Sequence, residues 1–147
     1  MKSFTILPFL GLLVAAYAII AILGPGTFGD YQGMSDFLGR ELFRITSIPS
    51  VSEANPLTLT TGDVLVTIGL VLLAFEIIKA TNTGMVSLLN HIFSGAVFVV
   101  SIVLFVAVPN FGTMTFFLIT MMTFVDFMGM IVTIITARRD IGVPGLA

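Results

Sequence analysis

The chain has 147 residues, of which 57% are hydrophobic and only 10% are charged, and its formal net charge is −2. Soluble domains are roughly 45–50% apolar and roughly 25% charged, so the composition excludes an ordinary soluble protein. The slightly acidic balance gives no basis for binding nucleic acid. We therefore expect an all-α membrane protein with a single membrane domain, residues 1–147.

Four stretches are apolar enough to cross a bilayer, whose hydrocarbon core of about 30 Å needs about 20 mostly apolar helical residues. The first could instead be a signal peptide with Ala16-Tyr17-Ala18 as its cleavage site. The apolar run continues to Leu23, however, which favours a retained helix. The four predicted transmembrane helices are at about 4–23, 61–80, 86–108 and 114–137.

Cap and turn signals separate the last three helices. Thr60-Thr61-Gly62-Asp63 predicts an N-cap followed by an acid in the first turn, where the carboxylate meets the positive end of the helix dipole. Tight turns are predicted at Thr81-Asn82-Thr83-Gly84 and at Pro109-Asn110-Phe111-Gly112.

The only sizeable loop lies between the first two helices, at residues 24–60. Ser35 is expected to cap a short amphipathic helix in this loop, because apolar residues recur at helical spacing around it. That helix would lie flat at the membrane surface, cap the bundle or dock a partner. An extended connector should follow it. The apolar positions are Met34, Phe37, Leu38, Leu42 and Ile45.

The basic residues near the helix ends predict the orientation, because cytoplasmic flanks collect lysine and arginine. With four crossings, Lys2, Lys79, Arg138 and Arg139 all fall on one side of the membrane. The loop at 24–60, with more acidic than basic residues, falls on the other side. We therefore predict a multi-pass protein with both termini in the cytoplasm and this loop outside.

Asp126 is the ionisable residue that lies deepest in a predicted helix. At about 1.5 Å per residue, it is about 18–20 Å from either end of its segment, near the bilayer midplane. An ionised side chain there costs at least about 2.5–3.5 kcal/mol on insertion scales. Asp126 should therefore face other helices, be protonated or touch water. Thr123 and Thr133 share its helical face, which predicts that this face points inward.

Glu76 and His91 lie on consecutive helices joined by a tight turn, each about 7–10 Å inside the predicted cytoplasmic end. With Asp126 they could form a path for protons or cations. Alternatively, Glu76 pairs with Lys79 at i,i+3, His91 is a neutral hydrogen-bonding residue and Asp126 is a protonated donor. The sequence favours this second interpretation and leaves the first open.

A stripe of small polar residues on the third predicted helix matches the stripe around Asp126. Membrane helices use small and hydroxyl side chains to approach closely and to hydrogen-bond with one another. We therefore predict that these two stripes meet inside the bundle. The predicted helix–helix contact residues are Ser87, Asn90, Ser94, Ser101, Thr123 and Thr133.

No catalytic or cofactor-binding constellation is recognisable. The chain has no cysteine and a single histidine, so thiolate, multi-histidine and bis-histidine haem sites cannot form within one copy. Without such ligands, the methionines of the last segment indicate packing and not copper binding. We expect no metal, no cofactor and no enzymatic activity.

The second half of the chain resembles a group of small uncharacterised four-helix inner-membrane proteins of alphaproteobacteria. The similarity rests on Glu76 to Gly84, on Asn90-His91 and on Thr115 to Val143. It implies a bacterial inner (cytoplasmic) membrane protein and places Glu76, His91 and Asp126 at the recurring polar positions of the group. It implies no particular activity.

Two functions are compatible with these features. The first is a structural or accessory subunit of a membrane assembly or homo-oligomer, whose partners are the lipid bilayer and other membrane subunits or a second copy. The second is a proton- or cation-conducting transporter or channel that uses Asp126, His91 and Glu76. The small size and the missing catalytic constellation favour the first.

Overall fold

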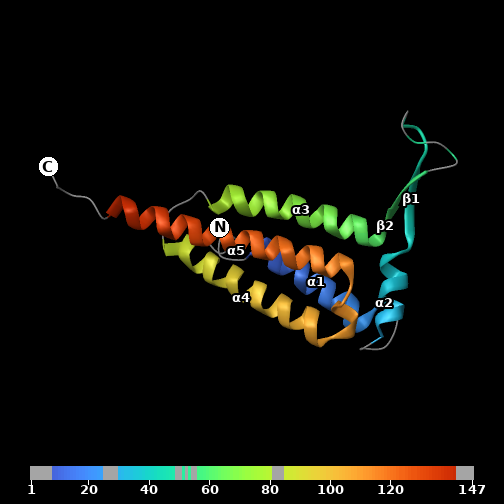
Figure 1. Cartoon of the computed structure of the whole chain (residues 1–147), viewed down its shortest axis with the longest axis horizontal. Coiled ribbons are helices and arrows are strands. Elements are labelled where there is room, and N and C mark those ends of the chain that lie inside the picture. The colour runs from blue at the N-terminus through green and yellow to red at the C-terminus, as the bar shows by residue number, and fades with distance from the viewer. Residues whose placement is uncertain are drawn as a thin grey trace.

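Four long helices lie side by side in a computed structural model of the chain (Figure 1). The structure describes residues 8–24, 30–48, 51, 53, 56–80 and 85–141, with side chains for all of these except residues 80, 85–91, 130 and 133–141. Successive long helices run in opposite directions, so the chain rises and falls through one bundle. The long helices are α1 (Phe9–Leu23), α3 (Thr61–Ala80), α4 (Met85–Ala107) and α5 (Met114–Ile141).

The predicted all-α class is confirmed, and α3, α4 and α5 lie close to their predicted ranges. Helix α1 ends at Leu23 as predicted and begins at Phe9, and residues 4–7 of its predicted range lie outside the described residues. The predicted range 61–80 matches α3, and α4 and α5 each begin within one residue of the prediction. By length and composition, the stretch Thr61–Lys79 is long and apolar enough to cross a membrane. The apolar stretches Phe9–Leu23, Ile92–Ala107 and Met114–Gly129 are shorter. Four crossings therefore remain a prediction.

The start of α3 is capped as the sequence predicts. The Asp63 carboxylate accepts hydrogen bonds from the Thr60 N–H at 2.9 Å and from the Thr60 hydroxyl at 2.8 Å. In return, the Asp63 N–H donates to Thr60 Oγ1 at 3.2 Å. This reciprocal capping box satisfies donors that an α-helix start leaves free, and it fixes the point where the chain enters α3.

The loop helix is present, but its predicted cap and end are wrong. Helix α2 (Tyr31–Leu38) begins after Asp30, whose side chain accepts the Gly33 N–H at 3.2 Å, and not at Ser35. It ends at Gly39. Met34 and Leu38 are buried, and α2 packs on the 3-10 turn η2 (Pro109–Phe111) and on α3. Of the predicted placements, α2 therefore adopts the one that caps the bundle.

Residues predicted as the second half of that helix form a β-hairpin instead. Strand β1 (Glu41–Ile45) pairs antiparallel with β2 (Leu57–Thr60), with Phe43 opposite Leu59 and Ile45 opposite Leu57. The register shifts between Glu41 and Phe43. The spacing of Leu42 and Ile45 suits a helix, but the backbone of this segment forms its hydrogen bonds with β2, later in the chain.

The core runs between α1 and α5 and is closed by α2 and η2. Tyr17, Phe111 and Phe116 are its largest fully buried side chains. The outer surfaces of the long helices are also apolar. In α3, for example, only 17% of the apolar stretch is buried inside the bundle. The buried core residues are Leu10, Leu13, Val14, Tyr17, Ala21, Met34, Leu38, Phe111, Phe116, Ile119 and Met122.

Candidate functional site

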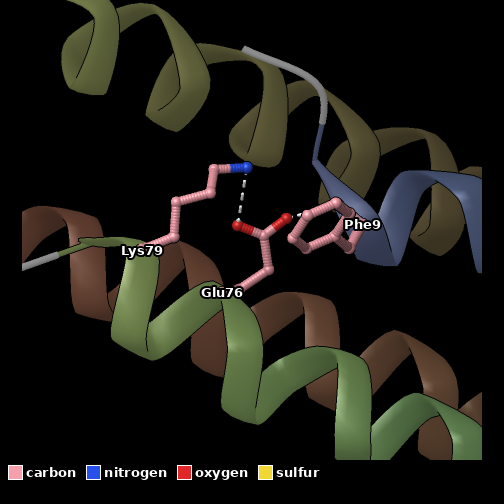
Figure 2. Close-up of polar contacts among 3 residues, drawn as sticks. All are labelled: Phe9, Glu76 and Lys79. Carbon is pink, nitrogen blue, oxygen red and sulfur yellow. Dashed lines mark hydrogen bonds and ion pairs between the residues drawn. The ribbon is translucent and has the colours of Figure 1, made fainter. Parts of the chain in front are cut away.

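Glu76 makes a polar contact between α3 and the start of α1 (Figure 2). Its residue is only 1% exposed. One carboxylate oxygen, Oε1, accepts a hydrogen bond from the backbone N–H of Phe9, and Oε2 lies 3.2 Å from Lys79 Nζ. The i,i+3 pair that the sequence suggests is therefore present, and Glu76 has an additional partner on another helix.

The helix start at Phe9 explains why a carboxylate is useful at this place. The first turn of an α-helix has N–H groups without intrahelical partners, and its dipole favours a negative charge. Pro8, the N-cap of α1, makes no side-chain cap. Glu76 supplies the acceptor and the charge from a neighbouring helix. The ammonium of Lys79 also lies 4.6 Å from the centre of the Phe9 ring, a cation–π distance.

Asp126 lies inside the bundle, as its helical face predicts. It is on α5, and its residue is 7% exposed. Thr123, one turn before it, is buried as well. The Thr123 hydroxyl donates to the Thr120 carbonyl at 2.7 Å, and the Thr120 hydroxyl donates to the Phe116 carbonyl at 2.9 Å. These hydroxyl groups are satisfied by their own helix.

The polar stripe of α4 is also buried where its side chains are described. Ser94 and Ser101 are buried, and the Ser101 hydroxyl donates to the Val97 carbonyl at 2.8 Å. Ser94 Oγ has no hydrogen-bond partner among the described residues. Because the bonds of Ser101 and Thr123 stay within their own helices, these residues promote close approach of α4 and α5 through their small size.

Four predicted site residues lie on α4 and α5 with only their backbone described. The side chains of Ser87, Asn90, His91 and Thr133 lie outside the described residues. Where side chains are described, no three His, Cys, Asp or Glu residues gather in a group that could hold a metal ion. A proton path through Glu76, His91 and Asp126 therefore stays a prediction.

Tyr17 is the centre of a buried polar and aromatic cluster that sequence reasoning missed. Its hydroxyl lies 2.6 Å from Thr113 Oγ1 and donates to the Asn110 carbonyl at 3.2 Å. The Asn110 side chain donates to the Ala21 carbonyl at 2.9 Å, near the end of α1. The cluster therefore ties the end of α1 to the connection between α4 and α5.

Two phenylalanines complete this cluster. The Tyr17 ring lies 4.7 Å from Phe116 and 5.5 Å from Phe111, and those two rings meet edge to face at 4.9 Å. A tyrosine and an asparagine in otherwise apolar segments could have indicated the cluster, because buried Tyr and Asn side chains need partners. Together, Glu76 and the Tyr17 cluster fix both ends of α1.

An apolar groove of about 530 Å³ opens between α1 and α4. Small residues line much of it, including Gly11, Ala15, Ala18 and Ala96. Phe93, Val97, Val100 and Leu104 form its α4 side. With an apolar lining throughout, the groove has no polar group positioned for catalysis and is suited to an apolar chain or another helix.

Comparison with known proteins gives no match to this chain: no protein-family model, no curated protein and no solved structure is significantly similar to it.

Proposed function

We propose that this protein is a small multi-pass protein of the bacterial inner membrane that serves as a structural or accessory subunit, either of a membrane assembly or of a homo-oligomer. The observation that carries the proposal is the distribution of polarity across the long helices. Leu70, Val71 and Phe75 are exposed on α3, whereas Glu76 and Asp126 are buried. A bundle that is apolar on its outside and buries the acids in the middle of its helices suits a lipid environment.

The contacts of the buried polar groups support an architectural role. Glu76 caps α1 and pairs with Lys79, and Tyr17 joins α1 to the α4–α5 connection. These groups hold helices together within the chain. In the part of the chain with described side chains, no group of three or more acids, histidines or cysteines could hold a metal ion. We propose that the protein acts through the surface it presents to neighbouring subunits.

We propose that the α1–α4 groove receives a transmembrane helix of a neighbouring subunit. The small, exposed residues Ala15 and Ala96 allow a second helix to approach closely, and close packing drives helix association in lipid. The lining of α1 spans Pro8 to Ala18, about 15 Å at the helical rise. That length matches about three turns of a partner helix.

Cysteine cross-linking tests this proposal, because the natural chain has no cysteine. Ala15→Cys in the groove should give a discrete cross-linked species in native membranes, either a dimer or an adduct with a second membrane protein. Val71→Cys, on the exposed face of α3, is the matched control and should give little. Equal cross-linking of both variants, or none from either, would contradict the proposed interface.

A second candidate function, proton or cation conduction, is favoured by the burial of Glu76 and Asp126. Ionisable groups inside membrane helices commonly mark ion paths. If the chain conducts, proteoliposomes should dissipate an imposed pH gradient, Asp126→Asn should abolish the flux, and Glu41→Gln in the exposed hairpin should preserve it. Flux that is absent in the natural protein, or unchanged in Asp126→Asn, would exclude this function.

A further inference from the structure

The β-hairpin of β1 and β2 has one apolar and one polar face. Successive strand residues point to opposite faces, and directly paired residues share a face. Phe43 is paired with Leu59 and Ile45 with Leu57, so these four apolar side chains lie on one face. Arg44 is paired with Thr58 on the other face. The hairpin is therefore amphipathic, and we call the first surface its apolar face.

Much of the apolar face is open in the described part of the chain, although Ile45 and Leu59 are half-buried. Phe43 is 65% exposed and Leu57 is 46% exposed. None of the four side chains belongs to the described hydrophobic core or packs against it. An isolated two-stranded hairpin is marginally stable in water, so this face needs a surface to lie on.

The position of the hairpin indicates which surface that is. In Figure 1 the hairpin extends across the direction of the long helices, at the end of the bundle where α3 begins. Thr60 ends β2 and directly precedes α3. If the bundle stands in a membrane, as the proposed function requires, the hairpin leaves it at the end of a membrane helix. It then runs parallel to the bilayer surface.

We propose that the hairpin lies on the lipid surface at this end of the bundle. Phe43, Ile45, Leu57 and Leu59 enter the headgroup region, and Arg44 and Thr58 face water. This inference rests on the proposed membrane role. An amphipathic element at the interface buries its apolar side chains at the boundary between headgroups and acyl chains and keeps its polar side chains outside.

The size of the apolar face favours lipid over a protein partner. Five strand residues span about 16 Å, and two paired strands are about 10 Å wide, which gives a face of about 160 Å². A stable protein interface buries about 800 Å² on each partner. The face is far too small to hold another subunit by itself, whereas a lipid surface needs no matching shape.

Single tryptophans test this proposal cleanly, because the natural chain contains none. Phe43→Trp probes the apolar face and Thr58→Trp probes the polar face of the same hairpin. Phe75→Trp, on the exposed surface of α3, reports whether the bundle itself is in lipid. Each variant is placed in nanodiscs with one protein per disc, and quenching by brominated phospholipids is compared with quenching by aqueous iodide.

We expect brominated lipid to quench Phe43→Trp and Phe75→Trp strongly, and iodide to quench Thr58→Trp several times more than Phe43→Trp. Iodide quenching of Phe43→Trp equal to that of Thr58→Trp would place the apolar face in water and overturn the inference. Shielding of Phe43→Trp from both quenchers would indicate protein contact and overturn it as well. Failure of brominated lipid to quench Phe75→Trp would instead contradict the membrane role itself.

Discussion

Glu76 connects residues that are far apart in the chain. Its carboxylate accepts the N–H of Phe9, 67 residues earlier, and pairs with Lys79, which is 13% exposed. A buried ion pair is a weak source of stability when both partners are compared with apolar residues. Loss of one partner is costly, however, because the interaction with Glu76 is removed while the other buried groups remain in place.

Removal of the Glu76 side chain should therefore destabilise the bundle strongly. We expect Glu76→Ala to lower the free energy of unfolding by about 3 kcal/mol, because it removes both the ion pair with Lys79 and the hydrogen bond from the Phe9 N–H. The measurement is thermal unfolding in mild detergent, followed by circular dichroism.

The matched variants are Lys79→Ala and the double variant Glu76→Ala/Lys79→Ala. The loss of unfolding free energy in the double variant should be clearly smaller than the sum of the losses in the two single variants. Each single variant already removes the interaction between Glu76 and Lys79, so the double variant does not lose it twice. Simple additivity would show that the Glu76–Lys79 pair is not coupled and would refute this account.

The Tyr17 hydroxyl provides a second prediction at this scale. We expect Tyr17→Phe to lower the free energy of unfolding by about 1–2 kcal/mol, because the Asn110 carbonyl and the Thr113 hydroxyl each lose a buried partner. Tyr31→Phe is the control, since the Tyr31 side chain is exposed and should contribute almost nothing. If thermal unfolding showed the same loss of stability for Tyr17→Phe and Tyr31→Phe, the hydrogen bonds of the Tyr17 hydroxyl would not contribute to stability.

Helices α3 and α5 approach each other closely at Gly62, where there is no room for a side chain. A Cβ added at Gly62, near the start of α3, would lie 2.5 Å from Thr115 Oγ1 on α5 and 3.4 Å from the Leu38 carbonyl oxygen. The capping box at Thr60 and Asp63 fixes the same turn of α3. Gly62 therefore sets the distance between α3 and α5 at the end closed by α2.

Two glycine substitutions separate this packing effect from helix propensity. Gly62→Ala should destabilise the bundle by about 1–3 kcal/mol, because an overpacked contact forces the helices to shift. Gly129→Ala on α5 should be neutral or stabilise by up to about 1 kcal/mol, since an added Cβ meets nothing within 4 Å. An equal change of melting temperature in both variants would contradict the close crossing at Gly62.

The long helices were predictable because apolar runs of about 20 residues, bounded by caps and turns, carry that information locally. The β-hairpin was not predicted, although Leu57-Thr58-Leu59-Thr60 alternates with the period of a strand. Its pairing with Glu41–Ile45 depends on residues far apart in the sequence. The extended connector was expected, but not its partner strand.

The site could be predicted only in part, for the same reason. Helical periodicity was enough to place Asp126 inward, and the i,i+3 spacing was enough to pair Glu76 with Lys79. The bond from Phe9 to Glu76 and the cluster around Tyr17 join segments 67 and more residues apart. Periodicity within one helix contains no information about such contacts.

At the scale of the whole molecule, the bundle has two unlike ends. The end where α1 ends and α3 begins carries α2 and the hairpin, and the opposite end contains the start of α1 and the end of α5 (Figure 1). This arrangement is compatible with both termini on one side of the membrane, which is the orientation that the basic residues favour.

Labelling of introduced cysteines tests this orientation. In spheroplasts, a membrane-impermeant maleimide should label Ser47→Cys, which lies just after β1. It should not label Ile141→Cys, at the last residue of α5. In inverted membrane vesicles the pattern should reverse. Labelling of both sites from the same side would require a different number of crossings.

The bond from the Phe9 N–H to Glu76 also has a consequence for biosynthesis. The ribosome synthesises α1 well before Glu76, which follows Phe9 by 67 residues. During that interval the first turn of α1 has no acceptor from its later neighbour. The first turn of α1 can therefore reach its final hydrogen bonding only after α3 has been synthesised and has packed against it.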